Sequence, residues 1–276
     1  MNNVVVRSIS GVVFILAMLA CLMFNKFLFA GLIIFIMSVM LLEFYHLTMG
    51  NSYTFSKVLA IIAAIFLFGL LFATASYHIP IRFVAFAMVP IFIVMINSLY
   101  VKDKDEYGKF SNIYTGLLYI AVPIALSNLI AFDKAGNFSG NLLLCFFIII
   151  WCSDVGAFAF GISLGKIFPQ KLFPSVSPKK TWIGFIGGLV SSVLAAFALY
   201  EFGILKFPLI HCLILSFIMS VTGVYGDLFE SQWKRVYGVK DSGKIIPGHG
   251  GFLDRFDSTL MAMPFGAIYL AIFDLL

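Results

Sequence analysis

The most regular feature of the chain is a series of apolar stretches, each about 20 residues long, separated by short polar or turn-forming breaks. Wound as an α-helix with a rise of about 1.5 Å per residue, such a stretch crosses the roughly 30 Å hydrocarbon core of a bilayer. We therefore predict about nine spans, at residues 8–25, 27–44, 57–76, 79–99, 112–131, 141–162, 182–200, 207–230 and 257–275. The predicted fold class is all-α, a polytopic transmembrane helical bundle.

The composition indicates many membrane spans rather than one. Of the 276 residues, 62% are hydrophobic and only 11% are charged, whereas about a quarter of the residues of a soluble domain are charged. The apolar excess extends along nearly the whole chain, which argues against a soluble domain with a single anchor. Residues 1–276 are predicted to form one integral membrane domain, with 1–135 mainly as scaffold spans and 141–276 as the catalytic half.

The formal net charge is +5, which in a soluble protein could indicate a nucleic-acid partner. No basic stripe with interleaved aromatic residues lies outside the spans, so we expect no nucleic acid to bind. If the nine spans alternate in direction, fourteen of the 18 lysines and arginines fall on the side of the N-terminus. Because positive residues gather on the cytoplasmic side of membrane proteins, we predict that the N-terminus and both long basic loops are cytoplasmic.

One aspartate, Asp154, lies well inside a predicted span, within the sequence Trp151-Cys152-Ser153-Asp154-Val155-Gly156. A charged residue there costs about 2.5–3.5 kcal/mol on insertion scales, so its side chain should face a polar cavity or a partner. The alternative is a structural aspartate that is hydrogen-bonded to Ser153 or to a neighbouring helix.

A second polar segment is the loop at residues 173–181, which ends where the span at 182–200 begins. Thr181 stands at the expected N-cap position, and Pro178 restricts the turn before it. Backbone N–H groups at a helix N-terminus beside Lys179 and Lys180 would form an anion site. The alternative is an ordinary positive loop that only sets the topology.

The densest polar segment runs from Gly226 to Ser258. It holds five acidic and five basic residues in 33 positions, in a chain with 18 basic and 13 acidic residues overall. If the span at 207–230 continues as a helix, four side chains share one of its faces: Asp227, Glu230, Ser231 and Lys234. Snorkelling helix-end charges do not account for this density, so we predict a functional site.

The residue types in this segment point to a phosphorylated substrate. Asp254 and Asp257 stand three residues apart at the start of the last span. Carboxylates from two helix ends suit Mg²⁺, which keeps coordination positions for phosphate oxygens and water. Lysines and arginines bind phosphate, and the glycines around His249 permit close backbone approach to a ligand.

The segment resembles the signature of the phosphatidate cytidylyltransferase family, the CDP-diacylglycerol synthases. That signature reads Ser-x-hydrophobic-Lys-Arg, four residues, Lys-Asp-x-small, two residues, hydrophobic-Pro-x-His-Gly-Gly-hydrophobic-x-Asp-Arg-hydrophobic-Asp. Its defined polar, glycine and proline positions are all occupied here, by Ser231, Lys234, Arg235, Lys240, Asp241, Gly243, Pro247, His249, Gly250, Gly251, Asp254, Arg255 and Asp257. The loop Ser177-Pro178-Lys179-Lys180-Thr181 is also similar to a family motif.

The resemblance implies transfer of a cytidylyl group from CTP to phosphatidate, releasing pyrophosphate, at the cytoplasmic face of the cell inner (plasma) membrane. It implies Mg²⁺ as cofactor, with a second cation and a homodimer left open, and CTP, phosphatidate and the lipid bilayer as partners. The metal ligands it implies are Asp227, Glu230, Asp254 and Asp257. The implied catalytic residues are Lys234, Arg235, Lys240, Asp241, His249 and Arg255. The implied substrate-binding residues are Ser177, Lys179, Lys180, Thr181, Ser231, Gly250 and Gly251.

Two positions depart from the family pattern, because Ile162 and Ile183 stand where an arginine and a glutamate are usual. Three other functions fit the residues less well. A CTP-dependent lipid kinase is not expected to carry the complete signature, and the aspartate motif of a CDP-alcohol phosphotransferase is absent. A transporter would distribute its charges along a pathway rather than gather them in the last third of the chain.

Overall fold

A computed structural model describes residues 3–101, 107–248 and 250–276, which are helical over most of their length. By the contacts among its residues, the chain divides into two compact units. The first unit holds Met1–Ser139 and Asp241–Arg255, and the second holds Gly140–Lys240 and Phe256–Leu276. The first unit thus combines the N-terminal part of the chain with Asp241–Arg255, and the division into scaffold and catalytic half stays a prediction.

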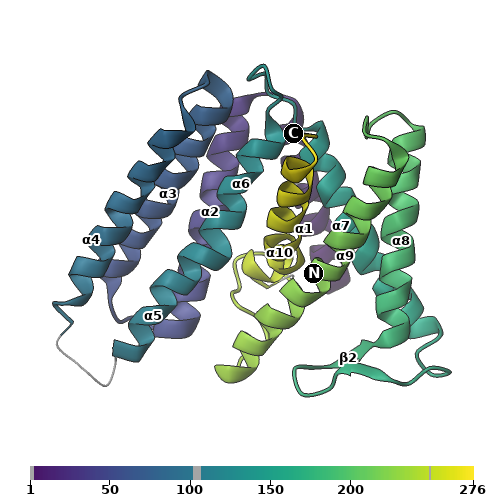
Figure 1. Ribbon diagram of the computed structural model, residues 1–276. Helices are drawn as coiled ribbons and strands as arrows, with labels where there is room; N and C mark the ends of the chain where they lie inside the picture. The colour runs from purple at the N-terminus through teal and green to yellow at the C-terminus, as the bar shows by residue number, and fades with distance from the viewer. Residues whose placement is uncertain (1–2, 102–106, 249) are drawn as a thin grey trace. The chain divides into compact units, whose positions relative to one another are not determined.

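The helices of the first unit coincide with the first five predicted spans (Figure 1). They are α1 (Asn3–Met23), α2 (Lys26–Met49), α3 (Thr54–Tyr77), η1 (Ile81–Ala87) with α4 (Met88–Ser98), and α5 (Tyr107–Gly116) with η2 (Leu117–Ala121) and α6 (Val122–Ala131). The break between α1 and α2 is short because Asn25 caps α2, its side chain accepting a hydrogen bond of 2.7 Å from the N–H of Phe27. In the fifth span, the π-helical turn η2 lies just before Pro123. A proline inside a helix removes one backbone hydrogen bond, and such a turn accommodates the loss.

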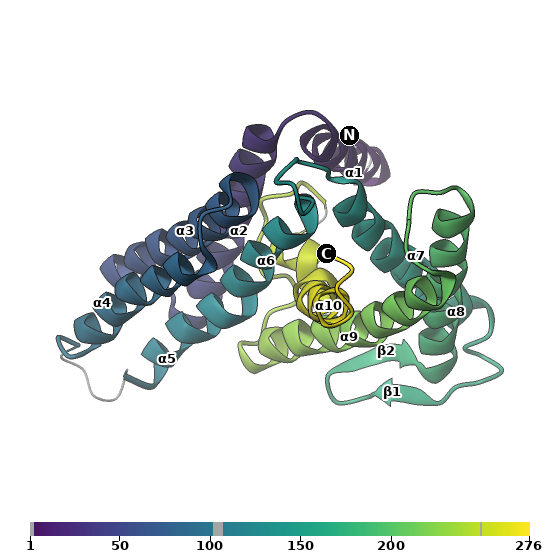
Figure 2. The ribbon, with the colours of Figure 1, turned by 45° about the horizontal axis from the view of Figure 1, so that its top comes forward.

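The second unit contains α7 (Asn141–Ser163), α8 (Trp182–Glu201), α9 (Leu209–Val236) and most of α10 (Leu253–Ile272). Residues 173–181, which were predicted to be a loop, belong to a small antiparallel hairpin. In this hairpin β1 (Lys171–Phe173) pairs with β2 (Ser177–Thr181). The pair Lys171 and Thr181 closes the hairpin directly before α8, and Figure 2 shows it at the start of that helix. The hairpin therefore holds the lysines of β2 in an extended, ordered backbone.

Among the described residues, seven helices are long and apolar enough to cross a membrane: α2, α3, η1 with α4, α5 to α6, α7, α8 and α9. The described apolar part of α1, Ser10–Met23, is shorter. α10 is not among the seven, and its first two turns carry Asp254, Arg255 and Asp257. All nine predicted segments are helical, and the fold is a polytopic helical bundle.

α7 and α8 pack closely because small residues face each other along both helices. A Cβ atom on Gly156 would meet the side chain of Ser191, and one on Gly187 would meet the ring of Phe160. A Cβ atom on Gly188 would lie 2.8 Å from the carbonyl oxygen of Ser153. In lipid, where helices gain little from hiding apolar surface from water, such small-residue contacts are a main source of helix association.

We predict that Gly156→Ala destabilises the protein by about 1–3 kcal/mol, the usual cost of overpacking a tight contact. The matched control is Gly69→Ala on α3, because a Cβ atom there meets nothing within 4 Å. That control should be neutral or stabilising by roughly 0.5–1 kcal/mol, since alanine favours a helix more than glycine does. Thermal unfolding in detergent, followed by loss of the monodisperse protein, measures both. Equal unfolding temperatures for the two variants would contradict the packing account.

Candidate active site

A cavity of 560 Å³ lies in the second unit, between α7, β2, the start of α8, and α9. Five residues singled out from the sequence line it together: Asp154, Lys179, Lys180, Thr181 and Asp227. The rest of its lining is largely apolar and includes Phe158, Ile162 and Phe185. A concave site of this size, with a few polar groups on an apolar wall, is typical of ligand-binding pockets.

The N-terminus of α8 forms one wall of this cavity. Thr181 is the N-cap residue, with extended backbone (φ −120°, ψ 155°), and its hydroxyl accepts a hydrogen bond of 3.2 Å from the N–H of Gly184. This confirms the predicted N-cap. Thr181 and Gly184 both line the cavity, so the partial positive charge of a helix N-terminus lies beside the two lysines.

An ion pair joins the hairpin to α9 across the cavity. The Lys180 Nζ lies 2.6 Å from the Asp227 Oδ2, and the two side chains are 25% and 31% exposed. The Ser231 hydroxyl donates a hydrogen bond of 3.2 Å to the other oxygen of the same carboxylate. Asp227 is therefore held from two sides while it remains accessible to a ligand in the cavity.

α9 continues as a helix beyond Asp227 to Val236, so the polar face predicted from the spacing exists. Its second pair, Glu230 with Lys234 one turn later, is an ion pair of two buried side chains. Burying a lone charge is costly, and an opposite charge one turn away offsets part of that cost.

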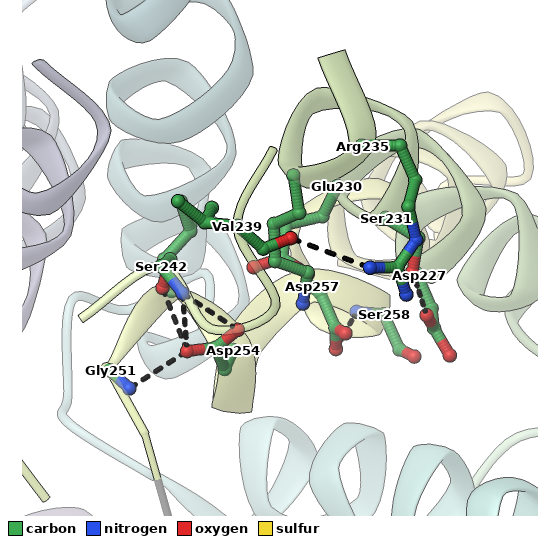
Figure 3. Close-up of polar contacts among 12 residues, drawn as sticks. Asp227, Glu230, Ser231, Arg235, Val239, Ser242, Gly251, Asp254, Asp257 and Ser258 are labelled. Atoms are coloured by element: carbon green, nitrogen blue, oxygen red, sulfur yellow. Dashed lines mark hydrogen bonds and ion pairs between the residues drawn. The ribbon is translucent and has the colours of Figure 1, made fainter. Parts of the chain in front are cut away.

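Asp257 lies against α9 at a point where the backbones of α9 and α10 approach each other closely. Gly226 permits this contact, because a Cβ atom there would collide with the carbonyl oxygen of Asp257. The negative charges of Asp227, Glu230 and Asp154 all act on the Asp257 carboxylate. The Asp257 Oδ1 accepts a hydrogen bond of 2.7 Å from the N–H of Ser258, as Figure 3 shows.

Asp154 both lines the cavity and has a partner on a neighbouring helix. The Ser258 hydroxyl on α10 lies 3.5 Å from its Oδ1. The neighbouring Ser153 instead pairs with Ser220 on α9 at 2.8 Å. The two interpretations of Asp154, a cavity residue and a hydrogen-bonded structural residue, are therefore compatible in this geometry.

The donor chemistry of this group fits a Mg²⁺ ion. Carboxylate oxygens are the ligands that Mg²⁺ prefers, and crowded carboxylates favour a bound cation. Within the described part of the chain, no three Asp, Glu, His or Cys residues are gathered closely enough to hold a metal by themselves. That is compatible with Mg²⁺, which is usually bound by one or two carboxylates together with substrate phosphates and water.

Asp254 and Gly251 of the signature take part in a second polar centre, which lies in the first unit at the start of α10 (Figure 3). Asp254 accepts hydrogen bonds from the N–H and the hydroxyl of Ser242, both 2.9 Å, and from the N–H of Gly251, 2.8 Å. The carboxylate thus ties together the two ends of the loop 242–251. Metal binding by Asp254 stays a prediction.

Sequence reasoning missed Glu43, which belongs to the part of the chain treated as scaffold. It lies in α2, is only 6% exposed, and accepts hydrogen bonds from the N–H groups of Phe252 (3.2 Å) and Leu253 (2.9 Å). Cβ atoms on Gly243 or Gly251 would collide with its carboxylate. The available signal was an acidic residue in the last turn of the span predicted at 27–44, and an ionisable residue within a span calls for a partner or a function.

These contacts explain several signature glycines. Gly250 has a left-handed backbone (φ 84°), and a Cβ atom there would lie 2.8 Å from the Asp254 carboxylate. Gly243 and Gly251 leave the space that the Glu43 carboxylate occupies. In the structure these glycines permit close approach to carboxylates of the chain, whereas substrate binding by Gly250 and Gly251 stays a prediction.

Of the remaining residues predicted to act in catalysis or substrate binding, most lie at the surface, one is partly buried and one lies outside the described part. The Arg235 guanidinium donates to the carbonyl oxygens of Val176 and Val239, each at 3.4 Å. Lys240, Asp241 and Arg255 are exposed, and Ser177 is partly buried in β2. His249 lies outside the residues that the structure describes.

Replacing Glu43 by alanine should loosen the loop before α10, because two buried N–H groups lose their acceptor at a cost of about 1–3 kcal/mol each. We expect faster hydrogen exchange in peptides covering residues 242–255, by roughly tenfold or more. Glu201→Ala at the exposed end of α8 is the control. Unchanged exchange in the Glu43 variant would show that this contact does not order the loop.

Comparison with known proteins agrees with the signature. The model of the cytidylyltransferase family matches residues 5–273. A phosphatidate cytidylyltransferase of Bacillus subtilis is 41% identical over 182 residues, which cover 65% of this chain and 63% of that protein. Proteins of the same name from Staphylococcus saprophyticus and Staphylococcus aureus are 45% and 46% identical over 124 residues, which cover 45% of this chain and 46% of theirs.

The matched part thus spans less than two thirds of the Bacillus relative and about half of the staphylococcal ones. The family model, in contrast, extends over nearly all of the residues described above, from α1 to the end of α10. The chain therefore belongs to the cytidylyltransferase family.

Proposed function

We propose that this chain is a phosphatidate cytidylyltransferase, which converts CTP and phosphatidate into CDP-diacylglycerol and pyrophosphate. The observation that carries the proposal is the cavity of the second unit, where two lysines and a helix N-terminus lie opposite carboxylates. That combination suits a nucleoside triphosphate, because cations neutralise phosphate charge and carboxylates hold a metal. The relatives named above carry the same activity in their names.

The reaction is an exchange at phosphorus. A phosphate oxygen of phosphatidate attacks the α-phosphorus of CTP, a new P–O bond forms, and the bond to pyrophosphate breaks. A phosphate monoester is already a nucleophile at neutral pH, so no strong general base is required. The main barrier is the approach of two anions, which positioning and charge neutralisation lower.

The residues of the second unit have separate tasks in this proposal. Lys179 and Lys180 bind the triphosphate together with the N–H groups at the start of α8. Asp227 and Asp257 would hold Mg²⁺, with Glu230 as the further predicted ligand in this unit. The chemistry that Mg²⁺ supplies when bound is neutralisation of charge on the phosphates. Ser231 orients Asp227 through its hydrogen bond.

We further propose that the cavity opens to the cytoplasm at the inner (plasma) membrane. The charge asymmetry of the loops supports this orientation, and so does the lysine-bearing hairpin beside the cavity. CTP is available in the cytoplasm, and a lipid can enter a helical bundle sideways from the bilayer.

The direct test uses purified protein, CTP labelled at the α-phosphate, and phosphatidate, with and without Mg²⁺. A cytidylyltransferase transfers the label into a lipid-soluble product and releases pyrophosphate, and only when Mg²⁺ is present. Unlabelled lipid together with released CDP would indicate a lipid kinase and contradict the proposal.

Lys180→Ala should lower kcat/KM for CTP by roughly ten- to a hundredfold. Loss of a hydrogen bond to a charged group costs about 1.5–3 kcal/mol, and each 1.4 kcal/mol corresponds to a factor of ten. The control is Lys166→Ala, because Lys166 is an exposed lysine after α7 that does not line the cavity. This variant should change kcat/KM for CTP less than about twofold, since an exposed charge away from the ligand contributes little. Equal losses in both variants would mean that Lys180 contributes only general surface charge.

Asp257→Asn should raise the Mg²⁺ concentration needed for half-maximal activity by about tenfold or more, because a carboxylate ligand becomes neutral. Asp274→Asn is the control, since this residue is exposed beyond the other end of α10. The measurement is the steady-state rate of each variant as a function of the Mg²⁺ concentration. An unchanged Mg²⁺ curve for the Asp257 variant would rule out that residue as a ligand.

A further inference from the structure

A second hollow, distinct from the polar cavity, lies entirely within the first unit. It is a groove of 330 Å³ between α1, α2 and the loop at residues 245–252. Met18 and Ile36 form its buried floor, at 2% and 1% exposure. Its rim is formed by large exposed apolar side chains: Val13, Phe35 and Ile245. Among the described residues that line it, only Ser10 has a polar side chain.

The loop that closes the groove is attached to both helices. The Phe252 ring packs edge-on against Phe14 of α1 and Phe35 of α2, with centroids 6.4 and 6.0 Å apart. The Ser10 hydroxyl donates a hydrogen bond of 3.0 Å to the carbonyl oxygen of Pro247. The groove is therefore built by specific contacts and is not simply a gap between two helices.

The same loop has polar partners along its backbone. The N–H of Gly251 bonds to Asp254, and the N–H of Phe252 bonds to Glu43. At the other end of the loop, exposed Lys244 directly precedes Ile245 of the rim. An apolar groove whose closing segment directly follows an exposed lysine matches an anionic amphiphile, whose tail needs hydrocarbon surroundings and whose head needs positive charge.

We propose that this groove binds one acyl chain of phosphatidate and that Lys244 contacts the lipid's phosphate. The proposal rests on the proposed function, which supplies an anionic lipid as substrate. The volume lies at the lower end of the roughly 300–1,000 Å³ typical of ligand sites, which suits one hydrocarbon chain rather than a whole diacyl lipid. The loop that closes the groove carries residues of the family signature. A bound acyl chain would therefore lie against a segment of that signature.

A variant pair on α1 tests whether the groove holds a chain. Ala17 lines the groove and is exposed, so Ala17→Trp fills the space without removing a buried side chain. Leu16, its exposed neighbour, does not line the groove, and Leu16→Trp is the matched control. Activity is measured with dioleoyl and with dihexanoyl phosphatidate in mixed micelles, at saturating CTP.

Ala17→Trp should lower kcat/KM for dioleoyl phosphatidate by about tenfold or more, since the loss of even one methylene contact in an apolar pocket is worth about tenfold. The dihexanoyl substrate should be affected less than about twofold, because its short chain needs little of the groove. Leu16→Trp should resemble the unmodified protein with both lipids. Equal effects of Ala17→Trp on both lipids, or no effect on either, would overturn the proposal.

Lys244→Ala tests the headgroup contact in the same assay. The loss of this charge should raise KM for both lipids by a similar factor while KM for CTP stays unchanged. A raised KM for CTP, or an unchanged KM for both lipids, would remove Lys244 from the lipid site.

A binding experiment separates this proposal from the proposed function. A phosphatidate carrying a photoreactive group in one acyl chain is crosslinked to the purified protein, and the labelled peptides are mapped by mass spectrometry. Labelling of α1 and residues 245–252 that excess phosphatidate suppresses, but phosphatidylcholine does not, supports the site even if the enzyme assay fails. Labelling elsewhere, or equal suppression by both lipids, would identify the groove as a surface for bulk lipid and overturn the proposal.

Discussion

Carboxylates placed among apolar helices need ion-pair or hydrogen-bond partners, and this requirement organises the polar parts of both units. In the second unit, Asp227 is paired with Lys180 of the hairpin, and Glu230 with Lys234 of its own helix. In the first unit, Glu43 accepts hydrogen bonds from two backbone N–H groups at the start of α10. Because unpaired buried charge is so costly, the contacts of Asp227 and Glu43 also help to determine where the hairpin and the loop before α10 lie.

The same pairings create the conditions for chemistry on phosphates. A carboxylate held by a lysine and a serine is ordered before any ligand arrives, so little entropy is lost when a ligand binds. The lysine is in turn held at the cavity, beside the N-terminus of α8. Under the proposed function, an incoming triphosphate competes for the lysine while a cation competes for the aspartate. The site thus exchanges internal ion pairs for ligand contacts.

Glycines allow these polar groups to reach their positions. Gly226 brings the backbones of α9 and α10 together at Asp257, and Gly243 and Gly251 leave room for the Glu43 carboxylate. Along α7 and α8, glycines replace the side chains that would otherwise separate the helices. A methyl group at any of these positions would displace a charged group or a helix, so the signature glycines are understandable from packing alone. Ile162 adds an apolar side chain to the wall of the cavity, at a position where the resemblance predicts an arginine.

The sequence by itself determined the helices, because an apolar stretch of about 20 residues has few other stable forms in a membrane. It also located the N-cap at Thr181 and the polar face of α9, since both follow from local spacing. The tertiary structure alone decided which distant residues meet: Lys180 with Asp227, Ser258 with Asp154, and Glu43 with the start of α10. It also decided that residues 173–181 take part in a hairpin and that Asp241–Arg255 groups with the first unit. Such pairings depend on how helices pack, and helical periodicity specifies only which face of a helix is polar, not which partner that face will meet.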